Sequence, residues 1–268
     1  MDSVSHPHRT QGLGRLLARL YAGAVYVFVF LPIAIVILMS FNSAKFGAFP
    51  LQGFSLDWYR QLFQDRTIWE ALSNSLIIAL GTILVAVPMG TMGAFALVRY
   101  QFRLKSLFTS ILVLPLVIPG LIIGISLLSF YHLLGVSTSR LTVILGHAAL
   151  VLPYATLMIA ARLQGFDIHL EEAAASLGAA PATVFRKVTL PVIASGIVAA
   201  ALFAWTISFD EFIVTFFIIG GAKQTLPLKI WSLLKFGISP KINAASAVIL
   251  TAALLLVTGG LAMMRGRK

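Results

Sequence analysis

Two adjacent carboxylates, Asp210 and Glu211, lie in a long apolar stretch and offer the most evident chemistry in the chain. An ionisable group inside a membrane span is costly, so by default it marks an ion or substrate pathway. In a helix that begins at Pro191, the rise of 1.5 Å per residue places Asp210 roughly 29 Å along the axis. We therefore expect both acids in the outer half of a span.

The two acids have different neighbours on this expected helix, because successive side chains point about 100° apart. Glu211 shares a face with Ser208 and Thr215, whereas the face of Asp210 also carries aromatic rings. A carboxylate beside rings suits an alkylammonium ion. The alternative is that one or both acids pair with a basic group on a neighbouring subunit or contact another partner protein. The candidates for the lining of a cation pathway are Asp210, Glu211, Phe203, Thr206 and Phe217.

The composition indicates a membrane protein. Of the 268 residues, 59% are hydrophobic and only 11% are charged, which is too apolar for a water-soluble fold of this length. Charged residues form short clusters, separated by six gaps of 21 to 34 residues. Because about 20 apolar residues cross a bilayer, we expect an all-α membrane protein with six transmembrane helices. The longest gap, Lys105 to Arg140, leaves room for one span and a loop over 131–139.

The charge distribution gives an expected topology. Residues 1–20 are expected to form an amphipathic cytoplasmic tail, residues 21–264 one six-helix transmembrane domain, and residues 265–268 a basic cytoplasmic tail. Lys and Arg modestly favour the side that this topology makes cytoplasmic. No basic run forms a continuous groove, so the net charge of +11 indicates contact with lipid headgroups rather than nucleic acid.

The loop between the fourth and fifth spans, residues 162–190, predicts two short helices. Asp167 can cap the first helix, and Gly178 suits the left-handed residue that ends it. Pro181 fits the first turn of the second helix, and Arg186 and Lys187 lie near its expected C-terminal end. A helix pair of this size cannot bury a core alone. We therefore expect it to dock onto another protein through its low-relief alanine surface.

The loop also resembles a family pattern. Glu172-Ala173-Ala174, then Gly178, then Val188 to Pro191 resemble the E-A-A-x3-G-x9-I-x-L-P loop of binding-protein-dependent ABC importer permeases, with Val188 in place of isoleucine. The resemblance implies the type I ABC importer permease fold, with this loop inserted into a cleft of a separate ATPase subunit. The ATPase-coupling residues that it implies are Glu171, Glu172, Ala173, Ala174, Gly178, Leu190 and Pro191.

Further segments are similar to the second permease of the polyamine (spermidine and putrescine) branch: 40–47, 162–167, 208–211, 226–232 and 239–244. This resemblance implies a bacterial inner-membrane subunit with both termini in the cytoplasm. Its implied partners are a homologous permease, two ATPase subunits, a periplasmic solute-binding protein and membrane lipids. The chain has no G-x-x-x-x-G-K-[ST] phosphate loop, so ATP and Mg are expected on the ATPase, with no cofactor or enzymatic activity in this chain.

Two other functions remain open at this point. A permease of the same family for a different small solute fits the loop equally well. An ion-coupled secondary transporter could use Asp210 and Glu211 to bind ions, although such transporters often show two similar halves, which this chain lacks. His147, in the fourth span, is expected to hydrogen-bond a neighbouring helix, because no second histidine lies three to five residues away.

Overall fold

A computed structural model describes residues 8–44, 51–221, 223–235 and 240–265. The ends of the two expected tails, residues 1–7 and 266–268, lie outside the described residues. The chain forms two compact units, one comprising residues 1–66 and 232–268 and the other residues 67–231. The loop 162–190 and the acid pair both lie in the second unit.

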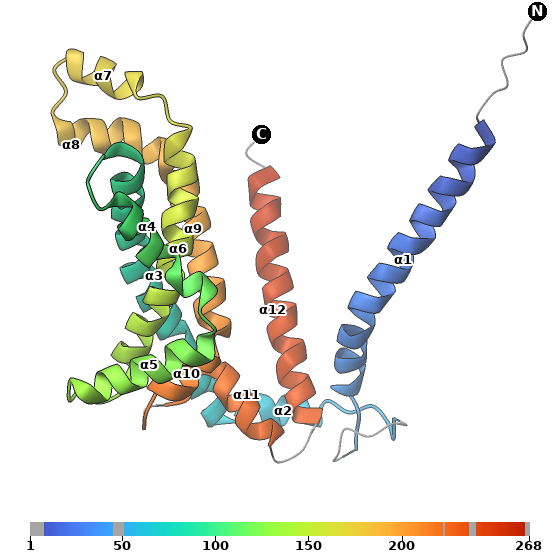
Figure 1. Ribbon diagram of the computed structural model, residues 1–268. Coiled ribbons are helices and arrows are strands. Elements are labelled where there is room, and N and C mark those ends of the chain that lie inside the picture. Colours follow the sequence, from blue (N-terminus) through green and yellow to red (C-terminus); the bar gives the residue numbers. More distant parts are fainter. Residues whose placement is uncertain (1–7, 45–50, 222, 236–239, 266–268) are drawn as a thin grey trace, which may run out of the picture. The chain divides into compact units, whose positions relative to one another are not determined.

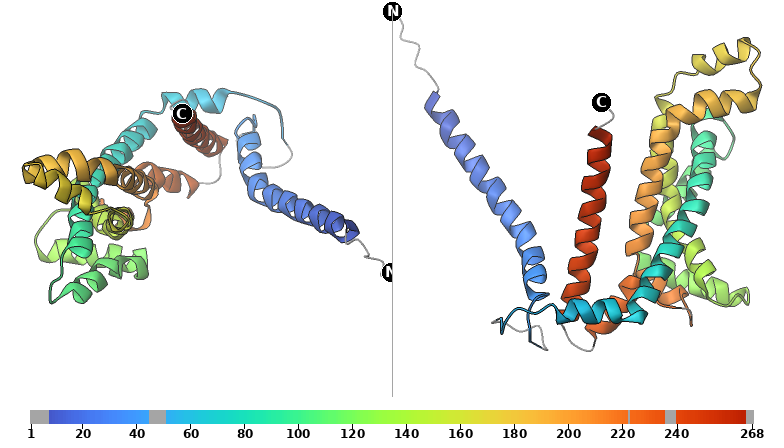
Figure 2. Two further views of the ribbon diagram at one scale, coloured as in Figure 1. Left: turned by 90° about the horizontal axis from the view of Figure 1, so that it is seen from above. Right: turned by 180° about the vertical axis from the view of Figure 1, so that it is seen from behind.

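Charged residues mark the ends of the long helices in the second unit. Its longest members, α3 (Arg66–Arg99), α6 (Arg140–Gln164) and α9 (Leu190–Asp210), each begin or end beside a charged residue. The shorter elements are α4 (Lys105–Val117), α5 (Gly120–Leu133), α7 (His169–Ser176), α8 (Pro181–Val184), a π-helical turn η1 (Phe185–Thr189), α10 (Ile213–Ile218) and α11 (Leu226–Leu234). Within this unit, α7 and α8 lie at one end of α6 and α9, and α5 and α10 lie at the other (Figures 1 and 2).

Small residues allow α3, α6 and α9 to pack closely. A Cβ atom on Gly90 of α3 would lie 2.7 Å from the Ala155 Cβ and 3.1 Å from the Thr156 backbone nitrogen of α6. Ile159 and Ile193, both wholly buried, fill the contact between α6 and α9. Close backbone approach at small residues is how helices associate in a lipid solvent that offers no hydrophobic drive between them.

The first unit contains α1 (His8–Met39), α2 (Asp57–Gln64) and α12 (Pro240–Arg265). The Lys241 Nζ atom lies 2.6 Å from the Asp65 Oδ2 atom and ties the start of α12 to the end of α2. The Trp58 indole N–H donates to the Asn42 carbonyl oxygen at 2.8 Å and holds α2 against the chain that leaves α1. Polar contacts therefore fasten these helices at one end.

The described helices account for four or five of the six expected spans. Four described helical segments are long and apolar enough to cross a membrane: Gly14–Met39, Arg66–Arg99, Arg140–Gln164 and Pro181–Asp210. The third expected span corresponds to α4 and α5, which are bent by 111° at a break and together make at most one crossing, the fifth. The bend follows from Pro119, which disfavours helical backbone at Ile118, where φ is −77° and ψ is 128°. Residues of the sixth expected span lie in α12.

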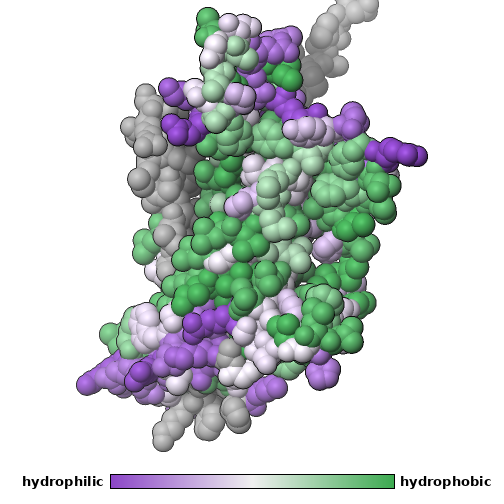
Figure 3. Space-filling model, turned by 90° about the vertical axis from the view of Figure 1, so that its left-hand side faces the viewer, coloured by the Kyte–Doolittle hydropathy of each residue, from purple (hydrophilic) through white to green (hydrophobic). Residues whose placement is uncertain are grey.

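The surface of the second unit fits a bilayer. Apolar side chains gather in a broad band across the face shown in Figure 3, and hydrophilic side chains lie at its two ends. Over residues 77–92 of α3 the exposed large side chains are apolar, including Leu80, Leu84 and Met92. Such a band is where hydrocarbon or another membrane helix can cover the protein without desolvating charges.

Candidate functional site

The loop 162–190 has the two predicted helices, and its local signals act as expected. The Asp167 Oδ1 atom accepts a hydrogen bond from the His169 backbone N–H at 3.0 Å, at the start of α7. Gly178 has φ +85°, the left-handed conformation that suits glycine, and its N–H donates to the Ala175 carbonyl oxygen at 2.9 Å. Pro181 occupies the first turn of α8. The helix pair is therefore fixed by short-range sequence signals.

The predicted end of the second loop helix is wrong. The helical backbone does not stop near Arg186 and Lys187 but passes through η1 directly into α9. In η1 the Leu190 N–H donates to the carbonyl oxygen of Phe185, five residues earlier, which is the bond pattern of a π-helix. The loop is thus continuous with the membrane helix that carries Asp210.

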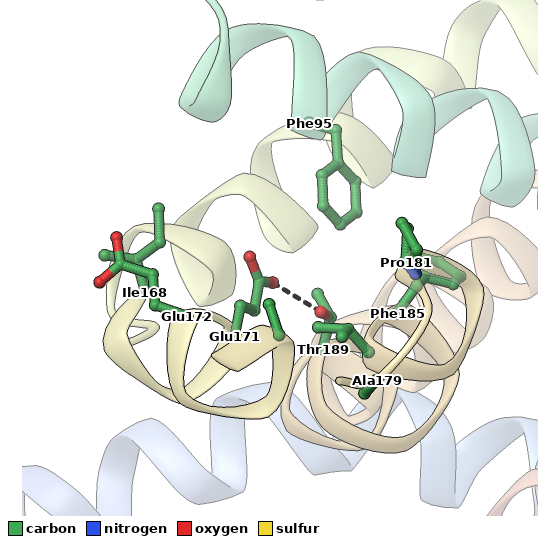
Figure 4. A pocket seen from close by; sticks show the side chains of 10 residues that line it. Phe95, Ile168, Glu171, Glu172, Ala179, Pro181, Phe185 and Thr189 are labelled. Atoms are coloured by element: carbon green, nitrogen blue, oxygen red, sulfur yellow. Dashed lines mark hydrogen bonds between the residues drawn. The ribbon is translucent and has the colours of Figure 1, made fainter. Parts of the chain in front are cut away.

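Glu171 points into the unit rather than toward solvent. Its Oε1 atom accepts a hydrogen bond from the Thr189 hydroxyl at 2.6 Å (Figure 4). The same atom lies 3.3 Å from the Arg99 guanidinium. Thr189 is buried, and the side chains of Arg99 and Glu171 are 17% and 24% exposed. Neither Arg99 nor Thr189 was a predicted partner of Glu171. Their separations from Glu171, 72 and 18 residues, left no local signal.

Glu172 has the opposite environment. Its side chain is 63% exposed and points away from Thr189 (Figure 4), and its Oε2 atom lies 2.9 Å from the His169 Nδ1 atom. The hydrogen bond to Glu172, followed by the negative charge of Asp167, raises the pKa of His169 above its ordinary value. No residue of α7 is buried, and Leu177 just beyond it is 89% exposed. The outer face of α7 is therefore available to a partner.

A cavity of about 430 Å³ separates α7 from α8, η1 and the end of α3. Glu171 and Thr189 line it, as do Phe95 and Phe185, whose ring centres lie 5.9 Å apart (Figure 4). Its lining is mostly apolar: Phe95, Ile168, Glu171, Glu172, Ala175, Ala179, Pro181, Val184, Phe185 and Thr189. The first loop helix consequently rests on few contacts.

The acid pair lies at a break between helices, at the far end of α9 from the loop. α9 ends at Asp210, and α10 begins only at Ile213. The Glu211 carboxylate accepts the backbone N–H of Val214 at 3.1 Å and so caps α10. Negative charge at a helix N-terminus is favourable. The position of Asp210 along α9 agrees with the prediction.

The prediction that Phe217 shares a helix face with Asp210 is wrong, because it took the helix to continue past Asp210. Phe203 and Thr206 do share α9 with Asp210, but Phe217 lies on α10, where a Cβ on Gly124 of α5 would lie 2.7 Å from its ring. Asp210 and Thr206 are exposed, and Phe203 is half-buried. Other rings flank the break in its place, in the pairs Trp205–Phe209 at 6.0 Å, Phe212–Phe216 at 6.1 Å and Phe212–Trp231 at 5.4 Å. These rings were not predicted, because the prediction took residues 203–217 to form one continuous helix.

His147 of α6 joins the helices around this break, as predicted. Its Nδ1 atom lies 2.8 Å from the Ser208 hydroxyl of α9, and its Nε2 atom lies 2.8 Å from the Thr215 hydroxyl of α10. The Thr215 hydroxyl donates to the Glu211 carbonyl oxygen at 3.0 Å, so it accepts from the Nε2–H. Ser208 also lies 3.1 Å from the Thr82 hydroxyl of α3. This chain of buried hydrogen bonds fixes both sides of the break.

Comparisons with known proteins agree with this geometry. Residues 83–265 match the model of the family described as "Binding-protein-dependent transport system inner membrane component". The spermidine/putrescine transport system permease protein PotC of Escherichia coli (strain K12) is 35% identical over 245 residues, which covers 91% of this chain and 92% of that protein. The putrescine transport system permease protein PotI of the same strain is 36% identical over 234 residues, covering 85% and 83%.

A solved structure has the same fold. A chain in the crystal structure of a bacterial ABC transporter involved in the import of the acidic polysaccharide alginate superposes with a TM-score of 0.73. The superposition covers 97% of this chain and 99% of that chain at 14% sequence identity. An all-α permease fold is therefore shared over nearly the full length.

Proposed function

Because the chain belongs to the family of binding-protein-dependent transport system inner membrane components, it is a permease subunit of an ABC importer, and we propose that it carries polyamines and is driven by an ATPase that docks on α7. The observation that carries the proposal is the contrast between the two loop acids. Glu171 is held inside the unit, and Glu172 projects from an exposed face. Glu172 is therefore the loop acid that a partner protein can contact.

The docking surface consists of the outer face of α7 and the residues that follow it. Ala173 presents little relief, so a cleft on the ATPase can approach the helix backbone, and the exposed Leu177 supplies apolar area for burial. Glu172 provides one negative charge that can pair with a basic group of the ATPase. ATP and Mg would be bound by the ATPase subunit. Leu190 and Pro191 begin α9, and they link the docked loop to the membrane helix.

The loop end of the second unit is proposed to be cytoplasmic, because an ATPase has ATP only there. Basic residues gather at this end, in the pattern expected for a cytoplasmic side. They are Arg99, Arg103, Lys105, Arg162, Arg186 and Lys187. In this orientation Asp210 lies at the outer end of α9. Cytoplasmic chain termini remain part of the proposal, on the resemblance to ABC importer permeases alone.

Polyamines are the proposed cargo, on two grounds. Both curated relatives named above transport putrescine, one of them together with spermidine, as their names state. The outer break also combines an exposed carboxylate, Asp210, with rings from Trp205, Phe209 and Phe212. Carboxylates and aromatic faces are the groups that attract alkylammonium ions. Asp210, Glu211, Phe203 and Thr206 remain our candidates for the pathway.

The proposed assembly contains this chain, a homologous permease, two ATPase subunits and a periplasmic binding protein. Its test is charge reversal at Glu172, with reversal at the exposed Asp57 of α2 as the matched control. Glu172→Lys is expected to abolish co-purification of the ATPase and ATP-dependent uptake, because it replaces an attraction with a repulsion. Asp57→Lys should leave ATPase co-purification unchanged. Retention of the ATPase by Glu172→Lys would show that α7 is not the docking element.

A further inference from the structure

We propose that Arg99, Glu171 and Thr189 form a latch that transmits the movement of α7 to the membrane helices α3 and α9. The inference rests on the proposed docking of an ATPase at α7 and adds the residues through which the docked helix acts. Glu171 is then a positioning residue inside the unit, distinct in role from its neighbour Glu172.

The latch joins three elements at one carboxylate. Arg99 is the last residue of α3, Glu171 lies in the first turn of α7, and Thr189 ends η1 immediately before α9. The Thr189 hydroxyl donates at 2.6 Å, within the short range typical of hydrogen bonds to an ionised acceptor. The same oxygen of Glu171 lies 3.3 Å from the guanidinium. A displacement of α7 therefore pulls directly on the ends of two membrane helices.

The surroundings make this carboxylate the principal polar link from α7 to the bundle. The other side-chain hydrogen bonds of α7 in the described part of the chain stay within the loop, from His169 and Ser176 to Asp167 and Glu172. The cavity of about 430 Å³ lies between α7 and the rings of Phe95 and Phe185, so close packing does not fasten the helix there. Apart from the short chain segments on either side of α7, a movement of this helix therefore reaches the bundle through few contacts.

Arg99 is itself held in place. Its guanidinium carbon lies 5.1 Å from the ring centre of Phe166, a buried residue that precedes α7. A guanidinium at this distance from a ring face is attracted to it. Arg99 thus contacts the chain both at Glu171 and just before α7, and the end of α3 follows the loop at two points.

A broken latch should separate ATP hydrolysis from transport without releasing the ATPase. The test uses the complete transporter in proteoliposomes and measures ATPase co-purification, ATP hydrolysis and uptake of labelled putrescine. For Arg99→Ala and Glu171→Ala we expect normal co-purification and an uptake per ATP hydrolysed that falls at least about tenfold. If both residues act through one contact, the double variant should be no worse than either single variant. Arg99→Lys, which keeps the charge, should recover part of the coupling.

Arg103→Ala is the matched control, because Arg103 is an exposed arginine at the same end of the unit. Normal coupling in both alanine variants would overturn the latch, and so would losses that multiply in the double variant. Loss of the ATPase from Glu171→Ala would also overturn it, by making Glu171 a docking residue. The proposed docking fails separately, if the wild-type chain does not retain the ATPase. Monodispersity in gel filtration identifies a variant that does not fold, in which case Arg99→Lys and Glu171→Gln carry the test.

Discussion

Replacement of His147 by alanine should destabilise the second unit strongly, because this ring holds three helices together. His147 is only 1% exposed, and its two nitrogens each lie 2.8 Å from a hydroxyl. Hydrogen bonds between membrane helices contribute about 0.6 kcal/mol each on average, and a cavity left by a ring adds more. The sum predicts a loss of about 2–4 kcal/mol in the free energy of unfolding.

The assay is reversible unfolding of the purified chain in mixed micelles, with His132→Ala as the matched control. His132 lies on the exposed surface near the end of α5, so its removal should change the free energy of unfolding by less than about 0.5 kcal/mol. His147→Asn should fall between the two, since its amide can replace one hydrogen bond but not both. Equal stabilities of the two alanine variants would refute the role of His147 as a connector of α6, α9 and α10.

Three further predictions concern the loop and the pathway. Gly178→Ala should weaken ATPase binding about fivefold, because φ +85° costs an L-residue about 1 kcal/mol while no neighbouring atom obstructs the new methyl group. ATPase affinity should fall severalfold as the pH is lowered from about 8 to about 6, because protonated His169 competes for Glu172, and His169→Gln should remove this dependence. Asp210→Asn combined with Glu211→Gln should abolish putrescine uptake while leaving the ATPase bound.

The sign of the pH effect follows from the direction of the pKa shift. The pKa of His169 is raised, so its ion pair with Glu172 is complete below the ordinary value and is lost as the pH rises through the raised value. An affinity that rises on acidification would contradict the competition. For Gly178 the control is Gly165→Ala, whose φ is −84° and should tolerate a side chain. Unchanged putrescine uptake by the double acid variant would exclude these acids from the pathway.

Local signals predicted those features whose causes are local. Gly178 and Pro181 specified the turn between α7 and α8, since one supplies the left-handed residue and the other an N-terminal turn. The bend between α4 and α5 also has a local cause in Pro119, because a residue that precedes proline disfavours helical backbone. Positions of the spans followed from charge clusters because charges are excluded from hydrocarbon.

The remainder depends on tertiary contacts. The hydroxyl partners of His147 lie 61 and 68 residues away in the sequence. A hydrogen bond to a neighbouring helix could therefore be predicted, but not which residues make it. The break after Asp210 contains no proline or glycine, and glutamate is not among the favoured N-cap residues. Nothing local therefore predicted it. The distinction between Glu171 and Glu172 likewise needed the position of Arg99 at the end of α3.

Passage of polyamines under the control of an ATPase docked at α7 is the function that we propose for this chain. Its most direct test is uptake of labelled spermidine and putrescine into proteoliposomes that contain the complete transporter and the binding protein, with and without ATP. We predict uptake that requires ATP in the wild type and is absent with Glu172→Lys. Uptake that proceeds without ATP, or that survives Glu172→Lys, would contradict the account, as would an ATP-dependent transporter that ignores both amines.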